Sequence, residues 1–226
     1  MFIQNQSCAI IDIRYRKGSN RMEQRNQTVM KLAQTAILAA LCYVSFTYLQ
    51  IKIPMPGGDA TSLHIGNAFC VLGALLLGGW YGGLAGAIGM GIADIMDPIY
   101  ITGAPKTFLL KLCIGLITGL VAHRIARINE SSDKAYVAKW STIAAVAGLG
   151  FNVVADPVVG YFYKMYILGQ PQQMAEVLAK WSTAATFVNA IVSTVLVSFL
   201  YNAVRPVLLR SGLLSGENRH TRPMAQ

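Results

Sequence analysis

Polar and charged side chains recur at four-residue intervals inside the apolar segments of this sequence. In the segment 137–166, Asn152, Asp156 and Gly160 are spaced by four residues, and Lys164 continues the series. This spacing places the side chains on one face of a helix. Because a charge within an apolar helix is costly to bury, each charged residue here is a candidate for binding or transport chemistry.

Two other apolar segments carry similar series. Thr107 and Lys111 are four residues apart in the segment 106–126. The segment 177–204 carries a polar stripe made of Ser182, Thr186, Asn189 and Ser193. All of these residues except Ser193 lie in the halves of their segments that would meet at one end of a helical bundle, its outer end. The pattern predicts a polar cavity that opens at that end and offers hydrogen-bond donors, acceptors and the Tyr161 ring to a small polar ligand.

Several of these residues also have a structural interpretation. Lys111 and Asp156 are compatible with a ligand contact and also with a structural ion pair between them. Asp97, which closes the segment 82–97 after Asp94, is either a site residue or a helix-end residue near water. His64, at the start of the segment 63–78, is a further candidate ligand contact, although a lone histidine there more often has a structural role.

The composition points to a membrane protein. Of the 226 residues, 54% are hydrophobic and 13% are charged, whereas soluble domains carry about 25% charged residues. The sequence contains no nucleotide-binding P-loop, no zinc-protease or serine-hydrolase motif and no acidic metal cluster. We therefore predict no enzymatic activity, no metal and no cofactor for this chain.

Six apolar segments predict an all-α bundle of six transmembrane helices. They are 31–49, 63–78, 82–97, 106–126, 137–166 and 177–204. A helix needs about 20 residues to cross a bilayer, so the second and third segments are near the lower limit. A glycine-rich turn at 78–83 separates them, and the last segment is expected to end near Arg205 and Pro206.

The distribution of basic residues predicts the orientation. The net charge is +9, and fourteen of the 19 Lys and Arg residues lie at the two ends of the chain or in the link after the fourth segment. The other five are Lys52, Lys106, Lys111, Lys164 and Lys180. Because basic residues concentrate on the cytoplasmic side, both termini are expected in the cytoplasm. Charges placed between apolar segments favour this interpretation over nucleic-acid binding.

The chain divides into three parts. Residues 1–29 form a polar leader, which is compatible with a disordered cytoplasmic extension or with a native start at Met22 or Met30. Residues 30–210 form the membrane domain, and residues 211–226 form a polar C-terminal tail.

Small residues at four-residue intervals predict close helix contacts. Gly82 and Gly86 in the third segment, and Gly115 and Gly119 in the fourth, favour packing inside the bundle. For the pair Ala36 and Ala40 in the first segment, packing inside the bundle and contact with another protein are both open.

The sequence resembles the substrate-binding S components of energy-coupling factor (ECF) transporters over about residues 30–210. The resemblance rests on six spans and on the order of five motifs. These motifs are the Ala36 and Ala40 face, the Pro/Gly-rich loop 53–59, the glycine-rich stretch Leu75–Gly91, the stretch Pro105–Leu116, and Gly160–Tyr163.

The resemblance implies a role in vitamin import across the bacterial plasma membrane. An S component binds a vitamin in an outward pocket and docks, through small residues of its first helix, onto a membrane scaffold subunit that carries two ATPases. Ala36 and Ala40 would form the docking face, and the loop 50–62 would cover the pocket. ATP hydrolysis would belong to the partner subunits.

The resemblance is nearest to proposed carriers of vitamin B6 and hydroxymethylpyrimidine, with riboflavin carriers as relatives. A site made of Lys111, Asn152, Asp156, Tyr161 and Asn189 suits a ring that carries hydroxyl and nitrogen groups. Riboflavin, pantothenate and other vitamins stay open as alternatives. An ion-coupled secondary transporter, with Asp156 or Asp94 carrying the ion, is the alternative from another class.

Overall fold

The computed structural model describes residues 2–211, and the side chains of these residues except 2–21, 23 and 56. The tail beyond Ser211 therefore lies outside the described residues. By its contacts the chain divides into two units, Met1–Gln34 and Thr35–Gln226. The first helix, α1, runs from Phe2 to Tyr48 and so belongs to both units. It includes most of the polar leader.

Five further long helices follow in the second unit. They are α2 (Gly66–Leu77), α3 (Gly79–Met96), α4 (Ala104–Gly119), α5 (Lys134–Phe162) and α6 (Gln172–Arg210). Short π-helical turns, η3 (Leu120–Ile125) and η4 (Tyr163–Ile167), extend α4 and α5. A short 3-10 turn, η2 (Ile101–Gly103), precedes α4. The predicted order of six helices is thus present.

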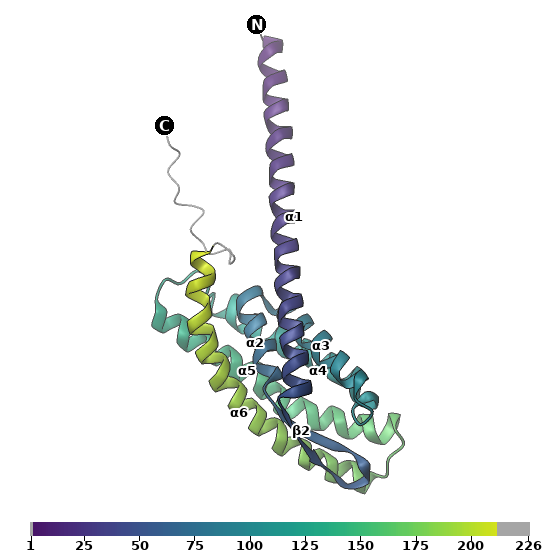
Figure 1. Ribbon diagram of the computed structural model, residues 1–226. Coiled ribbons are helices and arrows are strands. Elements are labelled where there is room, and N and C mark those ends of the chain that lie inside the picture. The colour runs from purple at the N-terminus through teal and green to yellow at the C-terminus, as the bar shows by residue number, and fades with distance from the viewer. Residues whose placement is uncertain (1, 212–226) are drawn as a thin grey trace. The chain divides into compact units, whose positions relative to one another are not determined.

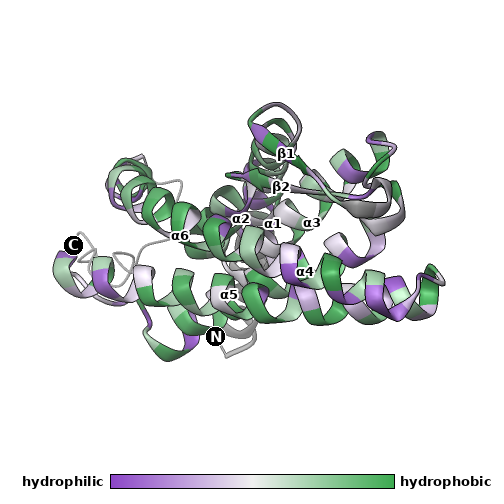
Figure 2. Cartoon of the chain, turned by 90° about the horizontal axis from the view of Figure 1, so that it is seen from below, coloured by the Kyte–Doolittle hydropathy of each residue, from purple (hydrophilic) through white to green (hydrophobic). Residues whose placement is uncertain are grey.

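Four helical segments in the described part of the chain are long and apolar enough to cross a membrane. They are Gln24–Tyr48, Ile101–Ile125, Lys134–Ile167 and Gln172–Arg210. The shorter α2 is apolar but has 11 of its 12 residues buried among its neighbours. Many large apolar side chains on α5 and α6 are exposed, including Val154 and Phe199. Figure 2 shows hydrophobic residues along most of these helices, as expected for contact with lipid tails.

The loop after α1 differs from the prediction. Residues 50–64 form a two-stranded antiparallel hairpin, with β1 (Gln50–Pro54) paired to β2 (Ala60–His64) around a 3-10 turn, η1 (Pro56–Gly58). The segment predicted to begin the second helix at residue 63 therefore ends a strand, and α2 starts at Gly66. Figure 1 shows the hairpin at the end of the bundle where α3 connects to α4 and α5 connects to α6.

Two predicted helix boundaries are wrong. The turn expected over 78–83 is reduced to Gly78, whose φ of 103° reverses the chain in one residue. The other glycines of this stretch lie inside α3. At the C-terminal end, α6 continues through Pro206 to Arg210. One proline removes a single backbone donor, and the helix tolerates this loss here.

Glycines bring α3 and α4 into backbone contact. A Cβ atom added at Gly115 would lie 2.2 Å from the backbone nitrogen of Gly83, and one added at Gly119 would lie 2.3 Å from the Cα of Gly79. A Cβ at Gly82 would lie 2.0 Å from the backbone nitrogen of Ala74 on α2. The prediction that the glycines of the third and fourth helices serve packing inside the bundle is confirmed.

We predict that Gly115→Ala destabilises the bundle. The added methyl group has no room beside Gly83, and overpacking of this kind costs about 1–3 kcal/mol. The melting midpoint of the purified protein in detergent should fall by roughly 2–10 °C.

Gly150→Ala is the matched control, because a Cβ atom at this helical glycine meets nothing within 4 Å. Its midpoint should stay the same or rise slightly, since alanine favours helix more than glycine does. Equal losses in the two variants would contradict the role assigned to the α3–α4 contact.

Candidate functional site

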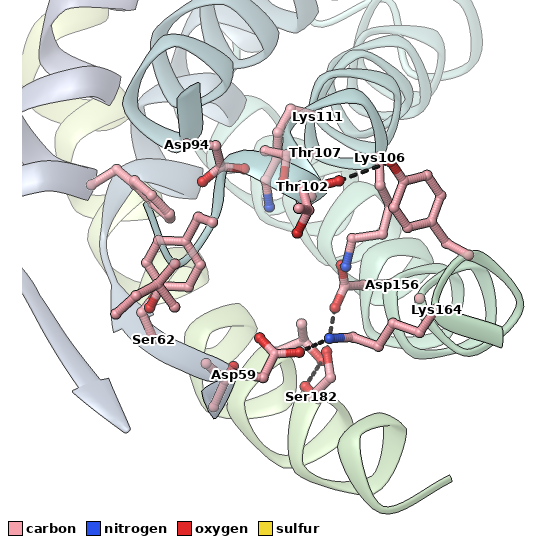
Figure 3. Close-up of a pocket in the computed structure, with 18 of the residues that line it drawn as sticks. Asp59, Ser62, Asp94, Thr102, Lys106, Thr107, Lys111, Asp156, Lys164 and Ser182 are labelled. Carbon is pink, nitrogen blue, oxygen red and sulfur yellow. Dashed lines mark hydrogen bonds and ion pairs between the residues drawn. The ribbon is translucent and has the colours of Figure 1, made fainter. Parts of the chain in front are cut away.

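A polar cavity opens at the hairpin end of the bundle. It encloses about 820 Å³, including its open mouth, and is walled by the hairpin, α3, α4, α5 with η4, and α6. Figure 3 shows the charged and hydroxyl side chains that point into it. The polar lining consists of Asp59, Thr61, Ser62, His64, Asp94, Tyr100, Thr102, Lys106, Thr107, Lys111, Asp156, Tyr163, Lys164, Ser182, Thr186 and Asn189.

Asp156 joins three helices at the wall of this cavity. The ammonium of Lys106 on α4 lies 2.9 Å from Oδ1 of Asp156 on α5. The hydroxyl of Ser182 on α6 donates a hydrogen bond to Oδ2 of the same carboxylate. Both oxygens of this largely buried carboxylate therefore have partners, as a charge in a low-dielectric setting requires.

The ion pair predicted as one alternative, Lys111 with Asp156, is not formed. Lys106 takes that position, although it is not among the site residues predicted from the sequence. The four-residue spacing drew attention to Thr107 and Lys111, whereas Lys106 lies directly after Pro105 at the start of α4. A lysine in the first turn of an apolar helix was the signal available in the sequence.

Lys111 and Asp94 lie deeper in the cavity. Their exposed fractions are 8% and 3%. The Thr107 side chain lies next to the Asp94 carboxylate, and Figure 3 shows the three residues close together on the wall formed by α3 and α4. No ion pair involves Lys111 or Asp94 within the part of the chain that the structure describes.

The hairpin is held to the bundle by its strands and by its tip. Asn189 on α6 accepts a hydrogen bond from the backbone N–H of His64 at 3.0 Å and donates one to the carbonyl of Ser62 at 2.9 Å. Lys52 on β1 forms an ion pair with Asp97 at the end of α3. Asp59, next to the hairpin turn, forms one with Lys164 in η4.

The Lys52–Asp97 contact changes the acidity of the carboxyl group. Burial alone acts to raise the pKa of Asp97, but the hydrogen bonds from Lys52 and from the backbone N–H of Ile99 outweigh it, and the pKa lies below its ordinary value. At Tyr100, beside this pair, burial raises the pKa of the phenol. The ring of Phe46 packs edge-on against Tyr100 and His64, with centroid distances of 5.8 and 4.7 Å.

Four of the seven residues predicted as ligand contacts line the cavity. They are Lys111, Asp156, Asn189 and His64. The other three lie elsewhere. Asn152 is buried one helical turn from Asp156, with its side-chain oxygen unpartnered. Asp97 lies outside the lining and faces Lys52.

Tyr161 also lies outside the polar cavity. It packs against Phe162 on the outer side of α5 and lines a shallow apolar groove with Val154 and Val158. One residue along a helix turns the side chain by about 100°, so the neighbour of Gly160 points away from the face that Gly160 occupies. Tyr163, two residues further on, lines the cavity instead and donates to the carbonyl of Thr102 at 2.8 Å.

Within the described residues, no group of three or more His, Cys, Asp or Glu side chains is placed to hold a metal ion. The side chains around the cavity are donors and acceptors for a small organic ligand. The fold and the cavity together define a helical protein with four described segments long and apolar enough to cross a membrane and a polar cavity at one end.

The comparison with family models identifies the chain more closely. The model described as "ECF-type riboflavin transporter, S component" matches residues 26–206, and the chain belongs to this family. ECF S components are substrate-binding transporter subunits and are not enzymes themselves. The resemblance inferred from the sequence motifs is thereby confirmed at the level of the S component.

A solved structure of ThiT from Listeria monocytogenes has a similar fold. The TM-score is 0.59 with 18% sequence identity, and the alignment covers 80% of this chain and 97% of that one. At this identity the similarity concerns the fold alone. No curated protein matches the chain in sequence.

We predict that loss of either hairpin ion pair increases hydrogen exchange in residues 50–64. Lys52→Met and Lys164→Met each remove one partner, and partly exposed pairs contribute about 0–1 kcal/mol. Exchange measured by mass spectrometry should rise roughly two- to fivefold. Lys180→Met, on the exposed side of α6, is the control and should leave exchange unchanged.

Lowering the pH should increase hydrogen exchange in the same hairpin. The pKa of Asp97 is lower in the folded than in the unfolded chain. The ion pair with Lys52 therefore stabilises the hairpin above pH ~4, and this stabilisation is lost as the pH falls below that value. Exchange of residues 50–64 that is equal in the unaltered chain and in Lys52→Met would show that this pair does not hold the hairpin.

Proposed function

We propose that this chain is the S component for a small water-soluble vitamin or precursor, with a compound of the vitamin B6 or hydroxymethylpyrimidine type as the favoured substrate. The observation that best supports this proposal is the cavity, whose lining combines three lysines, three aspartates and several hydroxyl groups. Phe46 and Tyr100 supply aromatic edges at the same site. This combination suits a compact ring that carries hydroxyl and nitrogen groups.

Riboflavin is the alternative substrate, because the family model that matches this chain is described as a riboflavin transporter component. Its three-ring system presents large apolar faces, which are best covered by apolar side chains. The cavity of this chain is lined mainly by charged and hydroxyl-bearing side chains. That lining supports a smaller and more polar ligand, and it is also compatible with pantothenate.

The partners that follow from the family are the subunits of an ECF module. We infer that Ala36 and Ala40 form the docking face for the membrane scaffold subunit, which carries two ATPases. Both alanines are exposed, and the large side chains of Ile37 and Val44 beside them are exposed as well. Close approach of a second helix to small residues is the usual basis of helix association in a membrane. The charge distribution supports cytoplasmic termini.

A stand-alone secondary transporter is the function from another class. In that case Asp156 or Asp94 would carry the coupling ion. Asp156 is engaged with Lys106 and Ser182, which favours a fixed binding wall over an ion carrier. Uptake into liposomes that contain this chain alone, driven by an ion gradient, would support the transporter and contradict the proposal.

We predict that the purified chain binds one compound of the B6 or hydroxymethylpyrimidine type without ATP. Titration calorimetry in detergent, with pyridoxine, hydroxymethylpyrimidine, riboflavin and pantothenate as a panel, should give one saturable isotherm that is unaffected by ATP. No saturable binding of any ring-containing vitamin would contradict the proposed function.

We predict that Ala36→Trp and Ala40→Trp spare vitamin binding but stop uptake in cells that contain the ECF module. A bulky ring on this face would keep the scaffold helix from approaching. Val195→Trp, at an exposed position on α6, is the matched control and should keep uptake.

Asp156→Ala should behave differently from these docking variants. It leaves Lys106 without its partner and should weaken binding itself, about tenfold or more. If Ala36→Trp weakened binding as much as Asp156→Ala does, the separation of docking face from cavity would be wrong.

A further inference from the structure

Four of the charged residues that line the cavity form two ion pairs, which we call the closed pairs. The other two do not form an ion pair with each other, and we call them the open couple. Lys106 pairs with Asp156, and Lys164 pairs with Asp59. Lys111 and Asp94 are left, one from α4 and one from α3. Formal charge in the lining is balanced, but these two charges do not meet in an ion pair.

The open couple is more deeply buried than the closed pairs. Lys111 and Asp94 are 8% and 3% exposed, and both line the cavity. On the same measure the paired residues Lys106 and Asp156 are only partly buried. Figure 3 shows Lys111 and Asp94 projecting into the same part of the cavity, with Thr107 beside them. The groups with the least access to water therefore lack an opposite charge at ion-pair distance.

Such an arrangement is costly for an empty protein. A buried ammonium or carboxylate needs an opposite charge or several hydrogen bonds to offset the loss of water. One ligand can supply both groups at once if it carries an anionic oxygen and a hydrogen-bond donor on a small frame. The interactions would then form only in the bound state, where they contribute to affinity and to specificity.

We propose that the ligand bridges Lys111 and Asp94, with a negatively charged oxygen facing the ammonium and an N–H or O–H donor facing the carboxylate. This inference rests on the proposed function and deepens it by naming the charge pattern of the substrate. A hydroxypyridine with an ionised ring hydroxyl and a protonated ring nitrogen has this pattern. A carboxylate on a molecule with hydroxyl or amide donors has it too.

The same geometry disfavours other ligands. A molecule with a positive charge alone would leave Lys111 without a partner and would add repulsion to it. A molecule without charge, such as riboflavin, would leave both buried charges without a counter-charge. Hydroxymethylpyrimidine has no anionic oxygen either, so of the two favoured substrate types the bridge selects the vitamin B6 type. Lys111 and Asp94 are thus assigned as residues that set specificity, and the two closed pairs as residues that hold the walls.

The test compares ligands with and without the negative oxygen, on the unaltered full-length chain in detergent. Pyridoxine is compared with 3-deoxypyridoxine, which lacks the ring hydroxyl and, at neutral pH, the proton on the ring nitrogen as well. Pantothenate is compared with pantothenol, which lacks the carboxylate. Calorimetry should show binding about tenfold or more weaker for the second member of whichever pair binds. Loss in the first pair identifies a ring hydroxyl as the source of the charge, and loss in the second identifies a carboxylate.

A protein variant links this difference to Lys111. Lys111→Met keeps a long apolar side chain but removes the charge, so the preference within the binding pair should fall to less than threefold. Lys180→Met, exposed on α6, should retain the full preference. Because the ligand comparison uses the unaltered chain, it does not depend on how the variant folds.

Each failure has a separate meaning. Equal binding of both members of a pair, or tighter binding of riboflavin than of any charged ligand, would overturn the bridge while leaving a vitamin-binding S component. A preference that persists unchanged in folded Lys111→Met would also overturn it. Absence of binding by every compound would contradict the proposed function itself.

Discussion

Backbone contact between α3 and α4 is the constraint on which the rest of the bundle depends. Gly83 meets Gly115 and Gly79 meets Gly119, at separations that exclude even a methyl group. In lipid, where apolar side chains gain little by leaving the solvent, such contacts supply dispersion energy that larger residues cannot. They also allow the short α2 to lie buried among longer helices, with the single-residue reversal at Gly78 before α3.

Charged groups gather at the hairpin end of the bundle. There the helix ends are joined by electrostatic contacts: Lys106 and Asp156 connect α4 to α5, and Ser182 adds α6. The hairpin depends on this same end, through Asn189 and the ion pair of Asp59 with η4. The paired charges lie on the walls of the polar cavity, and Lys111 and Asp94 lie deeper in it.

Much of the fold could be predicted from the sequence, because apolar segment length and four-residue spacing are local properties. The order of six helices, the polar faces of α4, α5 and α6, and the packing role of the glycines all follow from such spacing. The hairpin could not be predicted in this way. Its strands are short, and they are fixed by Asn189, a residue more than a hundred positions away along the chain.

What the sequence determined by itself is the class of molecule, the helices and the faces on which Lys111, Asp156 and Asn189 lie. Only the tertiary structure decided which charges pair. Asp156 meets Lys106 and not Lys111, because the rotation and depth of α4 against α3 and α5 are set by glycine contacts between helices. The tertiary structure also places Tyr163 in the cavity, where it donates to the carbonyl of Thr102, whereas Tyr161, about 100° around the helix from Gly160, faces outward.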